Sequence, residues 1–321
     1  MYITNEFKKF LKEAKGNNIS FTSGKAFSVF KTFVQYQDIY TNELDGISID
    51  RKQLADTVKL LDGEIVKEAE KVYVCKGARR KEMQTAKVWN ESMLSGTFVS
   101  TLDNEFYARY LKASSYASTD ETRYFMCGVY LEKDGTIVAT DGRILLAWYA
   151  DERFKSDSNQ IIRYNKMLNS LNISSILLYD SYIEFVTKDS VVYQVPFIKG
   201  CFPNYRRLVS DMDGYCSIEL TRELVESLRI AEKFADNKYH GVNVSNKGIR
   251  TISEHPYVDE IESEGWFDFN IDAIYLNKCI ADVDAIFGGK KYLEYKDDSK
   301  MLYLKDDKKI LLLMPVRKEN V

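Results

Sequence analysis

A threefold internal repeat constrains the fold of this 321-residue chain more than any other feature of its sequence. Gly128 is followed seven residues later by Gly135, and Gly241 is followed at the same interval by Gly248. Each pair predicts a strand, a glycine turn and a second strand, and each follows a segment with the apolar spacing of an amphipathic helix. The two helices are expected near residues 103–114 and 221–235.

The first third of the chain carries a reduced form of the same unit. A helix expected near residues 4–15 leads almost directly into the strand-like segment 19–25, which parallels residues 136–143. The first repeat is therefore expected to lack one strand of the hairpin and to be shortened.

The second half of the unit also recurs, as a strand followed by the start of a helix. These starts fall at Asp50, Arg163 and Asp272, which are separated by 113 and 109 residues. A period of that length is the size of a domain and is too long for a solenoid repeat. The prediction is an α+β fold of three tandem domains, each with helices on one face of antiparallel sheets. Their expected bounds are residues 1–96, 97–205 and 206–321.

The composition favours a folded protein, with 45% hydrophobic and 29% charged residues and only 4 prolines. No segment approaches the roughly 20 apolar residues that cross a bilayer, so a cytoplasmic protein is expected. The odd number of cysteines, 5, and their wide spacing argue against a disulfide framework or a zinc site. We expect free thiols, no metal and no cofactor.

Catalytic chemistry has little support in the sequence. The chain has only two histidines, His240 and His255, and neither lies at a metal-ligand spacing. The paired acids at 297–298 and 306–307 fall in expected turns. A hydrolase or nuclease is the alternative from the enzyme class, but no residue is predicted to be catalytic.

Basic residues recur along one face of the expected helices, although the net charge is −3. For a single helix, an ordinary solvated face is the simpler interpretation. Recurrence on equivalent helices favours a shared role, although the signal weakens in the last third, where Glu223, Glu226 and Glu232 dilute the basic residues.

Three segments resemble the bacterial DNA polymerase III beta subunit, the DNA sliding clamp. They are RYFMCGV at 123–129 followed by VATDGR at 138–143, FPNYRRL at 202–208 and LLMPVR at 312–317. Separately they could be a hairpin turn, an interdomain linker and a buried final strand. Together they occur in the order and spacing of the family, and the clear resemblance covers residues 97–321. Host and phage or mobile-element origins both remain open.

The resemblance implies a pocket between the second and third domains that binds a short motif with a Gln and two apolar side chains. The family's His-Arg after Asp-Gly is Arg143-Ile144 here, so the rim differs in charge. The residues expected to line the pocket are Met126, Thr140, Gly142, Arg143, Leu145, Pro203, Arg207, Leu208, Leu312, Met314, Pro315 and Val316.

The resemblance also implies a head-to-tail homodimer that encircles double-stranded DNA without sequence preference. DNA polymerase and other clamp-motif proteins would be its partners, and a separate clamp loader would open the ring. The residues expected at the subunit interface are Phe234, Lys233 and Met83. The residues expected to face DNA are Lys8, Lys12, Lys15, Arg51, Lys52, Arg109, Lys112, Arg163, Lys166, Arg222 and Arg229. A clamp-like protein that binds partner motifs without forming a ring is the alternative.

Overall fold

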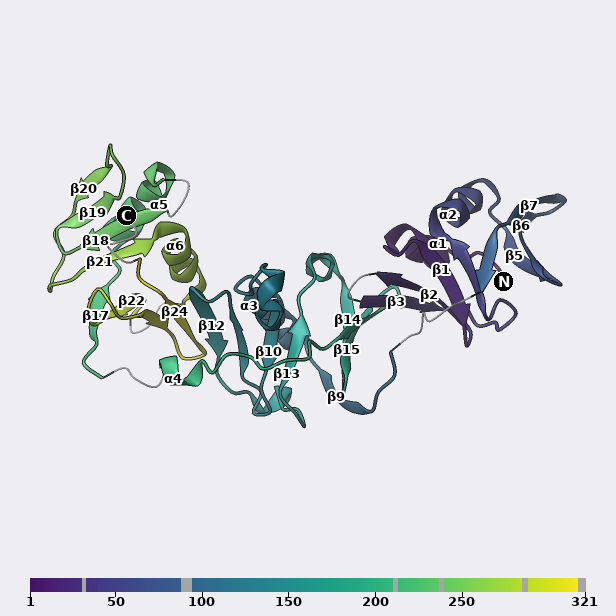
Figure 1. The fold of residues 1–321 in the computed structure, drawn as a ribbon, viewed down its shortest axis with the longest axis horizontal. Coiled ribbons are helices and arrows are strands. Elements are labelled where there is room, and N and C mark those ends of the chain that lie inside the picture. The colour runs from purple at the N-terminus through teal and green to yellow at the C-terminus, as the bar shows by residue number, and fades with distance from the viewer. Residues whose placement is uncertain (31–32, 88–93, 210–212, 237–239, 285–287, 317–321) are drawn as a thin grey trace. The chain divides into compact units, whose positions relative to one another are not determined.

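Figure 1 shows the computed structural model, which describes residues 1–30, 33–87, 94–209, 213–236, 240–284 and 288–316. The chain forms two compact units, one of residues 1–111 with 156–199 and one of residues 112–155 with 200–321. Both units combine helices with antiparallel strands, which confirms the α+β prediction. The middle third of the sequence contributes to both units.

A run of helix, four strands, a second helix and further strands recurs through the described part of the chain. The first run consists of α1 (Asn5–Glu13), β1 (Asn18–Thr22), β2 (Lys25–Phe30), β3 (Phe33–Asp38), β4 (Ile47–Asp50), α2 (Arg51–Leu60), β5 (Glu64–Glu68), β6 (Lys71–Lys76), β7 (Arg79–Met83) and the short β8 (Thr85–Lys87).

The second run has the same order, with three short 3₁₀ helices labelled η. It consists of β9 (Phe98–Leu102), α3 (Asn104–Ser114), η1 (Glu121–Met126), β10 (Gly128–Leu131), β11 (Ile137–Thr140), β12 (Ile144–Trp148), η2 (Glu152–Phe154), β13 (Gln160–Arg163), η3 (Lys166–Ser170), β14 (Ile173–Tyr179), β15 (Tyr182–Thr187) and β16 (Val192–Pro196).

The third run follows the four-residue helix α4 (Arg206–Val209). It consists of β17 (Cys216–Glu219), α5 (Arg222–Phe234), β18 (Gly241–Ser245), β19 (Gly248–Thr251), β20 (Val258–Glu260), β21 (Asp268–Asp272), α6 (Ala273–Asp282), β22 (Tyr292–Tyr295), β23 (Leu302–Lys305) and β24 (Lys309–Leu313).

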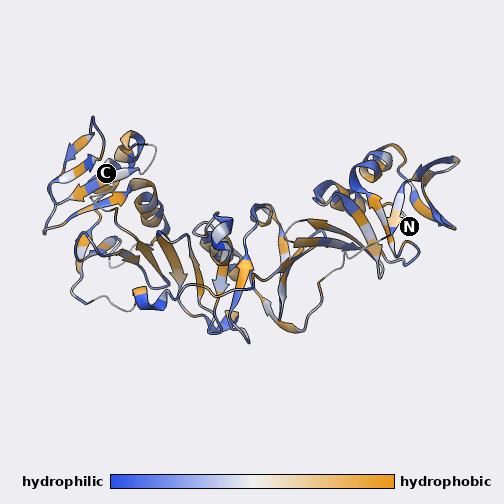
Figure 2. Cartoon of the chain, in the orientation of Figure 1, coloured by the Kyte–Doolittle hydropathy of each residue, from blue (hydrophilic) through white to orange (hydrophobic). Residues whose placement is uncertain are grey.

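Strands from different runs share sheets. In the first unit the order is β8-β4-β1-β2-β3-β16-β15-β14-β9, and β3 pairs with β16 with Tyr36 opposite Val192. In the second unit the order β10-β11-β12-β24-β23-β22-β17 places β12 beside β24. Many residues of these strands are hydrophobic (Figure 2). Their apolar side chains are buried and form the core on the faces of the sheets.

Capping side chains set where the main helices begin. Thr4 accepts a hydrogen bond from the Phe7 amide at 3.1 Å, and Thr221 accepts one from Leu224 at 3.2 Å. Asp50 and Asp272 do the same at the second helices of the first and third runs. Each cap satisfies an amide that the helix leaves without a partner. Within each unit the two helices of a run lie side by side, α1 with α2 and α5 with α6 (Figure 1).

Two expectations about the repeat are wrong. The first run does not lack a hairpin strand, because β1 pairs with β2 and residues 19–25 belong to the first strand and its turn. Gly24 at the turn has φ +71°, which glycine tolerates without strain. The helix expected to start at Arg163 is only the 3₁₀ helix η3, whose cap is Asn165, since Arg163 itself ends β13.

Candidate functional site

The turn between β11 and β12 positions the first group of predicted pocket residues. Thr140 donates its hydroxyl to the Ile144 carbonyl at 2.7 Å and accepts from the Gly142 amide at 3.0 Å. Gly142 has φ +91°, and a Cβ there would lie 2.9 Å from the Arg123 guanidinium and 3.9 Å from the Met126 methyl. Only glycine fits this backbone comfortably, and it brings Met126 against the turn.

The last strand brings the C-terminal segment to the same place. Leu145 lies opposite Leu312 in the β12–β24 pairing, and the Met314 amide donates to the Arg143 carbonyl at 2.8 Å. Two residues further on, the C-terminal segment contacts β21, where the Val316 amide donates to the Asn270 carbonyl at 2.8 Å. The turn and the C-terminal segment, far apart in sequence, therefore form one surface of the second unit.

The segment before and within α4 packs onto the same sheet. Phe202 stacks on Tyr130 with ring centroids 4.6 Å apart, and both pack against a buried cluster that contains Leu145, Leu312 and Tyr205. The Tyr205 hydroxyl donates to Glu132 at 3.0 Å, and the Arg206 guanidinium pairs with Glu132 as well. These anchors fix α4 on the sheet.

The predicted pocket residues divide into a floor and a rim. Met126, Thr140, Leu145 and Leu312 are buried, so they support the surface from below. Met314 and Leu208 are 47% and 39% exposed and offer apolar contact area. The remaining members are exposed or half-buried at the edge; they are Gly142, Arg143, Pro203, Arg207, Pro315 and Val316.

Besides Asp141 in the turn itself, three further residues belong to this surface and were not predicted to line it. The Tyr275 hydroxyl donates to Asp141 at 2.8 Å, and Arg123 donates to the Asp141 carbonyl at 3.1 Å. Burial, followed by the hydrogen bond to Asp141, raises the pKa of Tyr275 to about 12, so the hydroxyl stays a donor at neutral pH. Asn270 is the third, through its contact with Val316. Arg123 stood in a resembling segment, but nothing in the sequence indicated Tyr275 or Asn270.

Four predicted DNA-facing residues line a groove of about 500 Å³ between α1 and α2. Lys8 pairs with Asp62 at 2.8 Å, and Arg51 donates its Nε to the Gly16 carbonyl at 2.9 Å. Lys12 and Lys52 are exposed, and neither has an ion pair among the described residues. Lys59 and Asp56 complete the charged lining at an ion-pair distance of 3.5 Å. The groove keeps an excess of positive charge.

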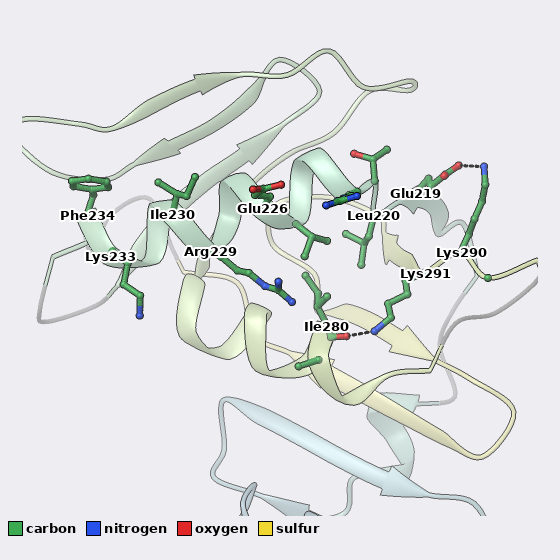
Figure 3. A pocket seen from close by; sticks show the side chains of 15 residues that line it. Glu219, Leu220, Glu226, Arg229, Ile230, Lys233, Phe234, Ile280, Lys290 and Lys291 are labelled. Atoms are coloured by element: carbon green, nitrogen blue, oxygen red, sulfur yellow. Dashed lines mark hydrogen bonds and ion pairs between the residues drawn. The ribbon is translucent and has the colours of Figure 1, made fainter.

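An equivalent groove of about 990 Å³ lies between α5 and α6 (Figure 3). Arg222 and Arg229 line it, and in the described part of the chain neither forms an ion pair. Figure 3 shows Arg229 extending from α5 toward α6. Lys290 pairs with Glu219 at 2.8 Å, and Lys291 donates to the Ile280 carbonyl at 2.6 Å. The apolar part of the lining includes Val225, Ile230, Phe234 and Ala281.

The other predicted DNA-facing residues lie elsewhere. Arg109 is only 8% exposed and its guanidinium bonds to Glu105, which contradicts a solvent-facing role. Lys112 pairs with Asp282, and Arg163 is half-buried with its carbonyl bonded to the Tyr110 hydroxyl at 2.8 Å. Lys15 lines a separate cleft beside η3. Lys166 is exposed on η3.

The predicted interface residues are not alike in exposure. Phe234 is 61% exposed and stacks on Tyr257 with ring centroids 5.4 Å apart. Lys233 is exposed, next to Glu232. Met83 lies in β7 opposite Val72 and is only 4% exposed. Its side chain is therefore buried, which contradicts the expected position at the subunit interface. The exposed part of β7, an edge strand, is its charged segment from Arg79 to Glu82.

Neither a metal centre nor a membrane-spanning helix is found among the residues that the structure describes. Their His, Cys, Asp and Glu side chains form no group of three or more that could hold an ion. None of their helices has the length and apolar character needed to cross a bilayer. The five cysteines are free thiols.

Solved structures share the fold along nearly the whole chain, whereas no protein-family model and no curated protein sequence matches it. Pol III beta of Caulobacter crescentus aligns with a TM-score of 0.76 at 18% identity, over 97% of this chain and 98% of that chain. The DnaN sliding clamp of Bartonella birtlesii, bound to griselimycin, aligns at 0.75 and 17%, over 97% of each chain. The DNA polymerase sliding clamp of Bacillus subtilis aligns at 0.73 and 15%, over 98% and 96%. The predicted clamp fold is therefore confirmed.

Proposed function

We propose that this chain is a DNA sliding clamp, a processivity factor that encircles duplex DNA and tethers a polymerase, with no catalytic chemistry of its own. The observation that carries the proposal is the match to sliding clamps over 97% of this chain and 98% of the Caulobacter crescentus chain. A match of that extent includes all three runs of helices and strands, which we assign to domains of residues 1–96, 97–205 and 206–321.

The charge distribution supports this function. A clamp needs only loose, sequence-independent attraction to phosphates, because topology keeps it on the DNA. Exposed cations in the α1–α2 and α5–α6 grooves supply that attraction in a chain whose net charge is −3. The excess of acids elsewhere discourages binding of DNA to other faces.

The surface around Met314 is the proposed site for partner motifs. It combines exposed Met314 and Leu208 with a buried floor and a basic rim that includes Arg143 and Arg207. Apolar side chains of a short peptide would bury against the methionine, whose flexible thioether adapts to several partners. DNA polymerase and other clamp-motif proteins are the proposed partners, and the cytoplasm is the proposed location.

The proposed ring is a head-to-tail homodimer that joins two sheet edges. β7 ends the β5-β6-β7 sheet and exposes Arg79 and Lys81, while β20 ends the β20-β19-β18-β21 sheet and carries Asp259 and Glu260. Edge strands have unpaired backbone groups that can pair with another chain. The opposite charges of the two edges favour β7 of one subunit against β20 of the next.

A closed ring must be opened before it can encircle DNA. The sequence has no glycine-rich phosphate-binding loop followed by Lys-Ser or Lys-Thr, so the ATP that drives opening would have to be bound by another protein. A clamp loader driven by ATP is therefore the last proposed partner. It would act on the assembled dimer.

The test is topological. The chain, loaded by a clamp loader onto nicked circular DNA, should stay bound through gel filtration and should be lost after one restriction cut linearises the DNA. Sedimentation should give the mass of a dimer. Equal retention on circular and linear DNA, together with a monomer mass, would instead identify a clamp-like binding module that forms no ring.

A further inference from the structure

Residues 94–97, here called the strap, lie just before β9 and belong to neither a helix nor a strand. The Gln194 carboxamide binds both backbone groups of Leu94. Its oxygen accepts from the Leu94 amide at 2.7 Å, and its nitrogen donates to the Leu94 carbonyl at 3.2 Å. One side chain thus satisfies the two groups that a neighbouring strand would otherwise pair. Gln194 is only 3% exposed, so its carboxamide is shielded from water.

The rest of the strap is fixed at the turn between β14 and β15. The Ser181 hydroxyl donates to the Ser95 carbonyl at 3.2 Å, and the Asp180 amide donates to the Thr97 carbonyl at 3.0 Å. Gly96 lies close to the same turn, because a Cβ there would be 2.5 Å from the Asp180 carboxylate and 2.7 Å from the Ser181 hydroxyl. A larger residue must therefore displace these side chains or lift the strap.

The strap covers the place where the first and second runs share a sheet. Its Leu94 side chain packs against a buried cluster that both runs supply, namely Phe27, Val34, Tyr36 and Val192. The first three belong to β2 and β3 of the first run, and Val192 belongs to β16 of the second. Gln194 lies opposite Val34 in the β3–β16 pairing, so the anchor of the strap is itself at this junction.

A buried carboxylate connects the strap to the first run. Glu184 is 4% exposed and accepts from the Gln194 carboxamide at 2.9 Å, which orients that side chain. The Tyr36 hydroxyl of β3 donates to the same carboxylate at 3.3 Å. Burial, followed by the nearby carboxylate, raises the pKa of Tyr36, so its hydroxyl remains a donor. Hydrogen bonds therefore extend from the first run through Glu184 and Gln194 to the strap.

We infer that the strap is a conformational device that holds the first run to the second, with Gln194 as its lock, and that its release loosens the β3–β16 junction. The strand pairing at this junction is short, from Val34 opposite Gln194 to Tyr36 opposite Val192. Short pairings open easily unless other contacts support them, and the strap adds an apolar cover and a polar anchor. In a ring of such subunits, a consequence that rests on the proposed function, the strap limits how far the first run moves when the ring opens.

Two variants release the strap from different sides. Gln194→Leu removes the carboxamide and keeps an apolar side chain on the sheet. Gly96→Val acts from an exposed position, and it covers the case in which Gln194→Leu does not fold. The matched control is Gln37→Leu, since Gln37 is a buried glutamine of β3, 5% exposed, whose side-chain oxygen has no hydrogen-bond partner in the described part of the chain.

Two measurements on the full chain follow the release. NMR of the chain with isotope-labelled leucine gives the hydrogen-exchange rate of the Leu94 amide. Spin labels at exposed Lys59 of α2 and exposed Lys188 of the β15–β16 turn give the distribution of distances between the two runs. The exposed Cys201 and Cys216 are replaced by serine so that only the two chosen positions carry a label.

The Leu94 amide should exchange at least about tenfold faster in Gln194→Leu and in Gly96→Val than in the parent, because its hydrogen bond to the lock is lost. The distance distribution should broaden in both variants, and Gln37→Leu should match the parent in both measurements. The inference is overturned if the Leu94 amide is unprotected in the parent, or if faster exchange leaves the distribution as narrow as the parent's. Neither measurement uses DNA, so failure of the clamp function would appear separately, as a parent chain that is not retained on circular DNA.

Discussion

A buried ion pair at the β23–β24 hairpin gives the sharpest test of how the C-terminal strand is held. The Lys309 ammonium donates to Asp306 at 2.6 Å, and the two side chains are 4% and 5% exposed. Asp306 also accepts from three backbone amides, those of Asp284, Lys308 and Lys309, at 2.8 to 3.0 Å. Lys309 has a second partner, Asp284, at 3.1 Å, and lies 4.8 Å from the centre of the Trp148 ring.

The unequal number of partners predicts unequal costs of substitution. Asp306→Ala removes the acceptor of four hydrogen bonds and leaves a buried ammonium with only Asp284, which is 79% exposed. Breaking a buried pair costs about 3–5 kcal/mol, and the surviving contact with Asp284 places this variant at about 3 kcal/mol. Lys309→Met leaves the Asp306 carboxylate bonded to its three amides, so it should cost only about 1 kcal/mol.

Urea denaturation followed by Trp emission and circular dichroism measures both changes in the free energy of unfolding. A cost of about 3 kcal/mol is a large part of the roughly 5–15 kcal/mol that stabilises a typical domain. Lys309→Met would contradict this expectation if it destabilised the chain as much as Asp306→Ala does. That outcome would mean that the ammonium, and not the carboxylate, organises the hairpin.

The same carboxylate predicts the direction of a pH effect. Burial alone would raise the pKa of Asp306, but the hydrogen bonds from Lys309 and from backbone amides outweigh it and leave the pKa below its usual value. A folded pKa below the unfolded one stabilises the protein above the unfolded value, about 3.9, and the contribution is lost as pH falls through the folded pKa. The free energy of unfolding should therefore fall below about pH 4 more steeply in the parent than in Asp306→Ala.

Three further outcomes are expected. Met314→Asp should weaken the binding of a Gln-Leu-x-Leu-Phe peptide, measured by calorimetry, at least tenfold, which is about 1.4 kcal/mol. Asp307→Asn, in the turn between β23 and β24, should leave the affinity unchanged; equal affinities of the Met314→Asp variant and the parent would refute the pocket assignment. Gly142→Ala should lower the free energy of unfolding by about 1–2 kcal/mol, because φ is +91°, and a neutral result would mean that the turn can relax. Phe234→Ala should shift the dimer toward monomer in sedimentation, more so at high salt, with exposed Leu60→Ala as control; a salt-independent equilibrium argues against ion pairs at the edges.

Local sequence signals predicted the helices that have a cap and an apolar stripe. The segment expected near 221–235 is α5 (Arg222–Phe234), where Thr221 caps the helix and Leu224, Leu228 and Ala231 are buried. The segment expected near 103–114 is α3 (Asn104–Ser114). Both patterns act within a few residues, so a single sequence contains them.

The missing second helix of the middle run had a signal that the spacing argument overlooked. Asp50 and Asp272 are good N-cap residues, but the equivalent position is Arg163, which cannot accept an amide hydrogen bond with its side chain. The periodic spacing alone predicted a helix there. The absence of a capping side chain at Arg163 favours the short 3₁₀ helix η3 over a long α-helix.

The sequence does not show which side chains the fold buries or which distant residues it brings into contact. Arg109 lies on α3 in the same way as other basic residues lie on their helices, and only the fold shows that it is enclosed. The same holds for Met83, whose apolar character fits an interface and a core equally well. Tyr275 reaches Asp141 because α6 packs beside the β11–β12 turn, a long-range contact with no local signature.

The positions of the acids explain how a chain with net charge −3 presents basic grooves. Asp50, Asp120, Asp151 and Asp272 accept backbone amides at the starts of helices or 3₁₀ helices, where the helix dipole favours negative charge. Asp282 and Asp306 are buried and neutralise single lysines. None of these six carboxylates lines the α1–α2 or α5–α6 groove. The sum of charges is therefore a poor guide to nucleic-acid binding here, because many acids cap helices and pair within the fold, while the groove linings keep more cations than carboxylates.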